Sequence, residues 1–457
     1  MKGPKVVLIG AGSAFFGRQT IWSMVSKDAL CRGTLALVDV NRDLLGTMVR
    51  IAERAIAARG VPLKLEASTD RRKVLQGADF VTLAFAVEGV KLRGVDADAS
   101  TKHGMIMCSA DTIGPGGTFR TLREVPHQNE ILRDVERLCP EAWVINWVNP
   151  TAAMGIAMRR HFPHLRSIAI CDGPHNPHFD NRLMVRAGLV KDPADISDRL
   201  RSEVLIRSGG VNHFNWLVEM RRGGADLVPK VMESLAREAA APVKKAHAKA
   251  HGNAQITYQL ARAVGYVPMC IGHTKEYLPY FQGHDVHRAD ALKIRKWEVA
   301  LRRQWMRDGW RDMKRIASGR RPIEDYLANT RPDHASDIIE AMWAGRRDAR
   351  FYINTPNRGA VPNMNDDAFL ELPCVVDMND VRPLPFGPMP RPILGFLQRV
   401  LDEHELAVEA AVTCDRKILR QALLAGMVAV SIPDVEAVMN ELLRREKAYL
   451  PKKWRKS

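Results

Sequence analysis

The stretch that decides the fold opens the chain, where Val6-Val-Leu-Ile-Gly10-Ala-Gly12-Ser-Ala-Phe-Phe-Gly17 joins an apolar run to a glycine-rich turn. The run Val6–Ile9 has the length and composition of a buried strand, and a helix is expected after the turn. Gly10 permits the tight turn, and Gly12 lets backbone amides approach a pyrophosphate at the helix N-terminus. The pattern predicts a Rossmann loop that binds a dinucleotide.

A second segment supports this prediction, because Phe15 stands where the third glycine of the usual fingerprint would be. Leu35-Ala-Leu-Val-Asp39 places an acidic residue at the end of the next strand. Asp39 is expected to accept hydrogen bonds from a ribose 2′-OH and to repel a 2′-phosphate, which favours NAD over NADP. The alternative is that Asp39 only caps the following helix.

Strands and helices alternate through the first 150 residues, which predicts βαβ units and a parallel sheet. The expected strands are 6–9, 35–39, 80–86, 143–147 and 166–171, and the expected helices are 14–30, 42–59 and 120–138. Ligands collect at the carboxyl ends of the strands in such sheets. Polar residues at those ends are therefore the candidates for a site.

The pattern changes after about residue 195. Strands are expected at 203–208, 216–221, 349–354 and 369–376, and helices at 228–248, 254–265, 287–316, 333–345, 391–413, 415–428 and 433–448. We predict an α/β protein with an N-terminal Rossmann sheet of the lactate/malate dehydrogenase type (residues 1–195). A mixed α+β domain (residues 196–457) is expected to carry substrate, metal and oligomer contacts.

Composition excludes several classes. A hydrophobic content of 46% and a charged content of 26% are typical of a globular protein, and no apolar run is long enough to span a membrane. Seven scattered cysteines indicate free thiols in a reducing, cytoplasmic compartment. The net charge of +16 is spread through amphipathic helices without a nucleic-acid-binding motif, so no nucleic-acid partner is expected.

Four segments combine polar residues with expected strand ends. They are Asp111-Thr-Ile-Gly-Pro-Gly-Gly117, Asn146-Trp-Val-Asn149-Pro150, Ile170-Cys171-Asp172-Gly173-Pro174 and Val211-Asn212-His213-Phe-Asn-Trp216. Each has a structural alternative: Asn149-Pro150 as a turn, Cys171 as a small buried residue, and His213 as a core histidine. The ordered set downstream of a dinucleotide loop is what favours a catalytic site.

Together these segments resemble the family 4 glycoside hydrolases, the NAD- and manganese-dependent glycosidases. The resemblance begins at Gly10-Ala-Gly-Ser13 and Asp39 and covers nearly the whole chain. It continues through Gly114-Pro-Gly-Gly, Asn149-Pro, Cys171-Asp172, Asn212-His213, Asp333-His-Ala-Ser336, Asn357-Arg-Gly359, Leu372-Pro-Cys374-Val-Val and Pro388.

The resemblance implies roles for these residues. Gly10, Gly12, Ser13 and Asp39 would bind NAD, and Cys171 and His213 would hold a divalent metal, usually Mn²⁺. A thiolate and an imidazole alone would also suit zinc. Asn149 and Asn212 would contact substrate, and Asp172 would be the general acid. NAD would oxidise sugar C3, the C2 proton would be removed, and the glycosidic oxygen would leave.

The base and the sugar are less determined. Tyr277 and His273, in Gly272-His-Thr-Lys-Glu-Tyr277, are the candidates for the base, and Tyr277 has simple packing as its alternative. Cys171-Asp172 is typical of members that act on α-linked, often phosphorylated, glucosides. Arg93 stands where relatives carry a phosphate-binding arginine, with a solvated surface arginine as its alternative. We expect an α-glycoside; an α-galactoside, an α-glucoside and a uronide stay open.

Two other classes of function compete. An NAD-dependent 2-hydroxyacid dehydrogenase would share the fold, but the sequence has no Asp-x-x-Arg followed by a suitable histidine. A non-catalytic nucleotide-binding or redox-sensing protein would bind NAD without metal-dependent sugar turnover. The resemblance further implies a homodimer or homotetramer whose partner is a small glycoside, with no membrane partner.

Overall fold

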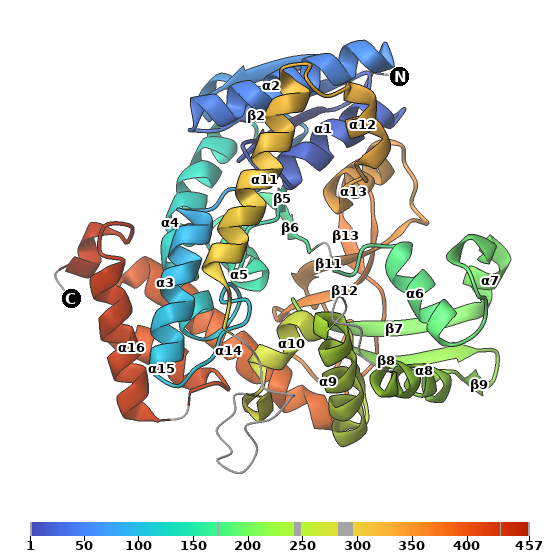
Figure 1. The fold of residues 1–457 in the computed structure, drawn as a ribbon, viewed down its shortest axis with the longest axis vertical. Coiled ribbons are helices and arrows are strands. Elements are labelled where there is room, and N and C mark those ends of the chain that lie inside the picture. Colours follow the sequence, from blue (N-terminus) through green and yellow to red (C-terminus); the bar gives the residue numbers. More distant parts are fainter. Residues whose placement is uncertain (1, 172, 242–247, 282–295, 430, 456–457) are drawn as a thin grey trace.

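The computed structural model describes residues 2–171, 173–241, 248–281, 296–429 and 431–455. Within them, the centre is one 13-stranded sheet with the path β10-β8-β7-β12-β11-β6-β5-β4-β1-β2-β3 (Figure 1). Its N-terminal half comprises β1 (Lys5–Ile9), β2 (Thr34–Val38), β3 (Lys64–Ser68), β4 (Phe80–Leu83), β5 (Trp143–Asn146) and β6 (Arg166–Ala169). All of these strands pair in parallel in the Rossmann order 3-2-1-4-5-6, which confirms the predicted fold class.

The C-terminal strands extend the same sheet. They are β7 (Val204–Val211), β8 (Phe214–Arg222), β9 (Ala225–Asp226), β10 (Val267–Pro268), β11 (Arg350–Pro356), β12 (Phe369–Val376) and β13 (Val381–Pro383). They pair antiparallel, and β11 joins the parallel half at Asn354↔Ala169. The antiparallel piece is therefore continuous with the Rossmann sheet, and the domain boundary at residue 195 stays a prediction.

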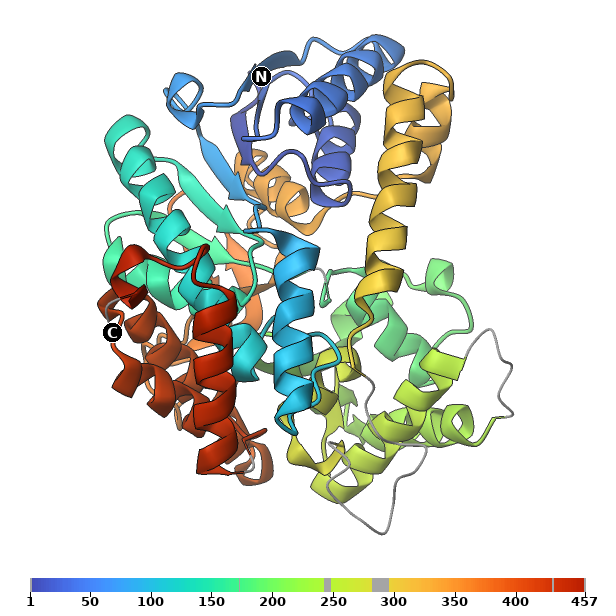
Figure 2. The same ribbon diagram turned by 60° about the vertical axis from the view of Figure 1, so that its left-hand side comes forward.

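One group of helices covers the face of the parallel strands that carries Val6 and Leu8. It comprises α1 (Phe16–Ser26), α2 (Arg42–Arg59), α11 (Val299–Ala317), α12 (Ile323–Asn329) and α13 (His334–Trp343). Helix α11 lies along α2 and α3 although about 250 residues separate it from α2 in the chain (Figures 1 and 2). The second half of the chain therefore completes the covering of the first.

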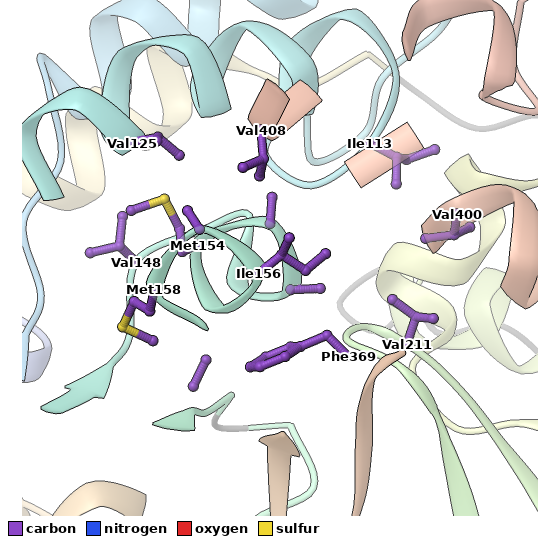
Figure 3. Packing of buried hydrophobic residues seen from close by; sticks show 14 of the residues in the cluster. Ile113, Val125, Val148, Met154, Ile156, Met158, Val211, Phe369, Val400 and Val408 are labelled. Carbon is purple, nitrogen blue, oxygen red and sulfur yellow. The ribbon is translucent and has the colours of Figure 1, made fainter. Parts of the chain in front are cut away.

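The opposite face, which carries Val7 and Ile9, is covered by a second group. It comprises α3 (Gly89–Lys102), α4 (Gly114–Leu138), α5 (Thr151–His161), α14 (Arg391–Thr413), α15 (Arg416–Ala425) and α16 (Ile432–Arg445). In Figure 2 the C-terminal helices lie beside α3 and α4. Figure 3 shows α5 at the centre of this core, with Met154, Ile156 and Met158 packed near Phe369 of β12.

The remaining helices surround the antiparallel strands. They are α6 (His178–Arg186), α7 (Asp198–Glu203), α8 (Val228–Ala240), α9 (Ala248–Val264) and α10 (Ile271–Tyr277). Part of the expected helix 287–316 lies outside the described residues, and its described part begins at Val299. Among helices in the described ranges, none combines the length and apolar character that crossing a bilayer requires.

Sequence reasoning missed β3, α3, α5 and α6 in the N-terminal part of the chain, and β3 and α3 show the reason most clearly. Strand β3 is a short edge strand whose side chains are all at least partly exposed, so it shows no apolar run. Helix α3 carries few large apolar residues, and much of its buried face consists of small or polar side chains such as Gly94, Ala97 and Ser100. Both elements are defined by their neighbours more than by their own hydrophobic pattern.

Candidate functional site

The glycine loop follows β1 at the carboxyl end of the parallel strands. Gly10 has φ +94°, and a Cβ there would lie 2.6 Å from the backbone of Ala84, so both its conformation and the close approach require glycine. The amide of Gly12 donates a 2.7 Å hydrogen bond to Oδ2 of Asp39. The side chain that caps α2 belongs to Asn41, so Asp39 lies against the loop and is not the helix cap.

The third glycine of the fingerprint is replaced in function by Gly17. A Cβ on Gly17 would lie 2.3 Å from the carbonyl oxygen of Ala11, so its absence lets α1 pack closely against the strand end. Phe15, which occupies the usual third position, is 53% exposed. The hydroxyl of Ser13 accepts a 3.1 Å hydrogen bond from the Phe16 amide and thus orients the start of α1. The contact of Ser13 with NAD stays a prediction.

Cys171 and His213 come together, as the resemblance implied. Cys171 lies two residues beyond β6, and His213 belongs to the two-residue turn between β7 and β8. Their Sγ and Nδ1 atoms are 3.3 Å apart, and the residues are 5% and 7% exposed. Bond lengths typical of a zinc site place two tetrahedral sulfur and nitrogen ligands about 3.5 Å apart, so the pair fits one divalent ion. Asp172, the expected general acid, lies outside the described residues.

The backbone at His213 is left-handed, with φ +61°. A non-glycine residue in this region is disfavoured by about 1–2 kcal/mol. The preceding Asn212 is fully buried, and its side-chain amide donates to Glu371 Oε1 at 3.2 Å. This geometry gives Asn212 a role in holding the turn. Its expected contact with substrate stays a prediction, which the burial of its side chain disfavours.

Glu371 is a functional candidate that sequence reasoning missed. This fully buried carboxylate on β12 accepts hydrogen bonds from the side-chain amides of Asn212, Asn215 and Asn354. It therefore ties the turn that carries His213 to the centre of the sheet. A lone acidic residue within the apolar run 369–376 was the available signal, since an unpaired buried carboxylate would be costly.

The two candidate bases occupy different environments on α10. The His273 ring stacks on that of His213, with centroids 3.9 Å apart and an interplanar angle of 7°. Burial lowers the pKa of His273 to about 4. Tyr277 is fully buried, stacks on Phe214, and donates a 3.0 Å hydrogen bond to the Asn212 carbonyl. Burial raises the pKa of Tyr277 well above its usual value, which fits the packing alternative better than the role of a base.

Asp111 organises the polar side of the site. Its Oδ2 lies 3.1 Å from an Arg93 nitrogen, 3.5 Å from an Arg120 nitrogen and 3.3 Å from Nδ2 of Asn149. Burial would raise the pKa of Asp111, but the charges of Arg93 and Arg120 hold it well below its usual range. Nδ1 of His273 lies 3.9 Å from Oδ1. Three residues that the sequence predicted for the site, Arg93, Asn149 and His273, thus lie around Asp111. Sequence reasoning gave this carboxylate no role.

Glu276 is a second carboxylate beside this cluster. It is fully buried and accepts a 2.7 Å hydrogen bond from the Ser109 amide. Burial, reinforced by the charge of Asp111, raises the pKa of Glu276 to about 7. Near neutral pH Asp111 is therefore ionised while Glu276 is partly protonated. Neighbouring carboxylates whose pKa values are pushed apart are typical of acid–base sites.

Comparison with known proteins places this chain in a family. The model of the family 4 glycosyl hydrolases matches residues 5–179, and the model of their C-terminal domain matches residues 208–427. The chain is 27% identical to an α-galactosidase of Bacillus subtilis, with 98% of this chain and 99% of the relative covered. It is 26% identical to a 6-phospho-β-glucosidase of Escherichia coli, with 98% of this chain and 96% of the relative covered.

Solved structures share the fold. A 6-phospho-α-glucosidase from gut microorganisms, in complex with NAD and Mn²⁺, is similar over 98% of this chain and 99% of its own, with a TM-score of 0.79 and 21% identity. A malate dehydrogenase of Cryptosporidium parvum is similar over 90% and 100%, with a TM-score of 0.52 and 12% identity. The two family models together span most of the chain, from residue 5 to residue 427. The chain therefore belongs to the family 4 glycosyl hydrolases, and it is a glycosidase.

Proposed function

We propose that this glycosidase hydrolyses an α-glycoside by transient oxidation at sugar C3, using NAD and a divalent metal, Mn²⁺. The observation that carries the proposal is the 3.3 Å approach of the Cys171 thiol to the His213 imidazole beyond the carboxyl end of β6. Such a pair supplies two ligands in suitable geometry for one divalent ion. The NAD- and Mn²⁺-bound relative supports the choice of cofactors.

The residues of the chain divide into those that hold cofactors and those that handle the sugar. Gly10, Gly12, Ser13 and Asp39 would bind NAD, while Cys171 and His213 would hold the metal. When bound, the two cofactors supply reversible oxidation at C3 and stabilisation of negative charge on the adjacent oxygens.

The proton transfers fall to side chains. A ketone at C3 acidifies the C2 proton, which a base removes, and the glycosidic bond then breaks as Asp172 protonates the departing oxygen. We favour His273 over Tyr277 as that base because 24% of the His273 side chain is exposed, whereas Tyr277 is fully buried. Water then adds at C1 and gives a proton back to Asp172, the base returns its proton to C2, and C3 is reduced again, so the net reaction is hydrolysis without net redox change.

Asn149 and Arg93 are the proposed substrate contacts. Asn149 reaches the site from the end of β5, where a sugar hydroxyl would compete for its bond with Asp111. Nη2 of Arg93 is bonded to Ser109 Oγ at 2.6 Å and paired with Asp111. Since this guanidinium is already neutralised, the arrangement favours an uncharged sugar. Phosphorylated and uronide substrates are the alternatives, and the β anomer is a further one.

The competing dehydrogenase function shares only the fold, at 12% identity to the malate dehydrogenase. It would leave Cys171 and His213 without a role. Steady formation of NADH from a 2-hydroxy acid would favour it, and NAD binding without sugar turnover would favour the non-catalytic alternative. The seven scattered cysteines of the sequence fit the proposed cytoplasmic location, and a homodimer or homotetramer is the proposed assembly.

The test is a panel of nitrophenyl α- and β-glycosides, with and without a 6-phosphate, together with nitrophenyl uronides. Each is assayed with NAD, Mn²⁺ and a thiol reductant, and again after chelation. We expect release of nitrophenol without accumulation of NADH, only from α-glycosides, and loss of release after chelation. Turnover that survives exhaustive chelation, or that produces NADH in proportion to product, would overturn the proposal.

A further inference from the structure

A buried histidine of α13 contacts the backbone of Cys171, and the proposed function gives this histidine no role. Nδ1 of His334 lies 2.8 Å from the Cys171 carbonyl oxygen, and His334 is fully buried. We propose that His334 is a positioning residue, whose ring N–H holds the Cys171 carbonyl and thereby sets the thiol where it can bind the metal together with His213. The inference rests on the metal assignment made under the proposed function.

The backbone of Cys171 needs such a partner because it lies beyond the strand that leads to it. The pairing of β6 with β5 ends at Ala169↔Asn146, and the Ile170 amide then donates a 2.9 Å hydrogen bond to the Asn146 carbonyl. A buried polar group that is left without a partner costs about 1–3 kcal/mol. The bond from His334 therefore anchors a carbonyl that lies outside the pairing of the parallel strands.

The surroundings of His334 hold its ring in the orientation that this bond requires. A carbonyl oxygen only accepts hydrogen bonds, so Nδ1 of His334 is the nitrogen that carries the hydrogen. The ring stacks on that of His175, with centroids 4.8 Å apart and an interplanar angle of 18°, and its centroid lies 6.0 Å from that of Phe351. Asp333 caps α13 by accepting a 2.6 Å hydrogen bond from the Ser336 amide, which fixes the turn that carries His334. The donor is thus held in place before any metal binds.

Helix α13 binds the same part of the chain at a second point. Nε2 of His175 lies 2.6 Å from Oδ2 of Asp337, and Nζ of Lys27 lies 2.6 Å from Oδ1 of the same carboxylate. Asp337 follows His334 by three residues, and positions three apart lie on one face of a helix. One face of α13 therefore holds the chain at Cys171 and again at His175, four residues later.

The position of the Cys171 sulfur depends on this backbone. Nδ1 of His213 lies 3.3 Å from Sγ, and the Gly173 amide donates to the same Sγ at 3.3 Å. An amide that donates to sulfur stabilises the thiolate, which is the form that binds a metal. Rotation of the Cys171 backbone would displace both the sulfur and the Gly173 amide. Groups that hold a metal ligand in this way typically contribute about 10- to 100-fold to metal affinity.

The test is the Mn²⁺ affinity of the full-length protein in the presence of NAD, measured from the electron paramagnetic resonance signal of free Mn²⁺. H334N and H334L introduce side chains of nearly the same shape, and only H334N offers an N–H to the Cys171 carbonyl. We expect H334L to raise the Kd for Mn²⁺ at least about tenfold, and H334N to stay within about threefold of the parent. Ile338→Val, a buried change on the same helix, is the control, which should lower the melting temperature without changing the Kd.

The outcomes separate this inference from the proposed function. Parent-like affinity in H334L, with Mn²⁺ binding abolished in C171S, would leave the proposed metal site intact and overturn the role of His334. Equal weakening in H334N and H334L would show that the ring acts through packing, and would also overturn it. Absence of Mn²⁺ binding in the parent, or unchanged binding in C171S, would overturn the metal assignment and this inference with it.

A second variant keeps the inference testable if H334L does not fold. H334F retains a ring that can stack on His175 but lacks the N–H, so it should weaken Mn²⁺ binding as H334L is expected to. Parent-like affinity in H334F would show that the ring, and not its N–H, holds Cys171, and the inference would be wrong.

Discussion

The thiol of Cys171 and Nδ1 of His213 lie 3.3 Å apart, although two strands, β11 and β12, separate β6 from β7 in the sheet. The contact depends on the β7–β8 turn, which directs the His213 side chain back over the end of the parallel half. His213 occupies a left-handed conformation there, with φ +61°. A disfavoured conformation that persists at a buried histidine points to a requirement for the imidazole.

The first prediction separates the backbone of His213 from its side chain. Asparagine tolerates the left-handed region, so His213→Asn should fold with a melting temperature close to that of the parent. Loss of the imidazole should lower kcat by at least about 100-fold and weaken metal binding to a similar degree. Melting curves, steady-state kinetics and metal titration check this. A variant with parent-like affinity for Mn²⁺ would contradict the assignment of His213.

Asp39 should determine affinity for NAD and discrimination against NADP. Its carboxylate bonds to the Gly12 amide at 2.7 Å, and it is expected to bond to a ribose hydroxyl as well. Loss of its charge in Asp39→Asn weakens charge-assisted hydrogen bonds by about 1.5 kcal/mol, so the Kd for NAD should rise about tenfold. The Kd for NADP should change less. Calorimetry measures both, and Glu53→Gln, an exposed change on the nearby helix α2, is the control.

Glu371 should be required for the stability of the turn that carries His213. In Glu371→Gln one acceptor oxygen becomes an amide donor that faces asparagine amides, which leaves buried donors without acceptors. The expected loss in free energy of unfolding is about 1–3 kcal/mol, measured by urea denaturation. Adding Asn215→Asp returns an acceptor and should recover part of the loss. Glu409→Gln, exposed on α14, should change stability by less than about 0.5 kcal/mol.

Glu403 should make stability depend on pH. Its carboxylate accepts a hydrogen bond from the Gly114 amide at the start of α4, and burial raises the pKa of Glu403 to about 8. The folded state therefore holds the proton more tightly than the unfolded state does. The stability that protonation provides is complete below the unfolded pKa near 4.5 and is lost as pH rises through about 8.

Glu403→Gln, which keeps an acceptor for Gly114, removes this titration. Between pH 6 and pH 9 the melting temperature of the parent should fall by several degrees relative to that of the variant. Parallel curves for the two proteins over this range would show that Glu403 does not titrate there. Gln398 lies on the exposed side of α14, the helix that also carries Glu403. Gln398→Glu adds a carboxylate without burial and should leave the pH dependence of the parent unchanged.

The sequence by itself determined the Rossmann half, the positions of most elements and the order of the polar segments. Strand β1, the glycine turn and helix α2 follow from local periodicity and turn chemistry, which a short window of residues contains. It also placed Asn149, Cys171 and His213 at the ends of expected strands. Such residues are candidates for one site because the carboxyl ends of parallel strands meet at one edge of a sheet. Each of these inferences depends on neighbours in the chain.

The tertiary structure alone decided which of these side chains meet and which are buried. It turned Asn212 and Tyr277 into the interior, placed Asp111 between Arg93 and Arg120, and brought Cys270 to His213. These relationships depend on how β11 and β12 join the two halves of one sheet and on the direction of the β7–β8 turn. Residues remote in sequence determine both the joining of the two halves and the direction of the turn. The free energies of burial and strand pairing that fix these two features arise only when the whole sheet is assembled.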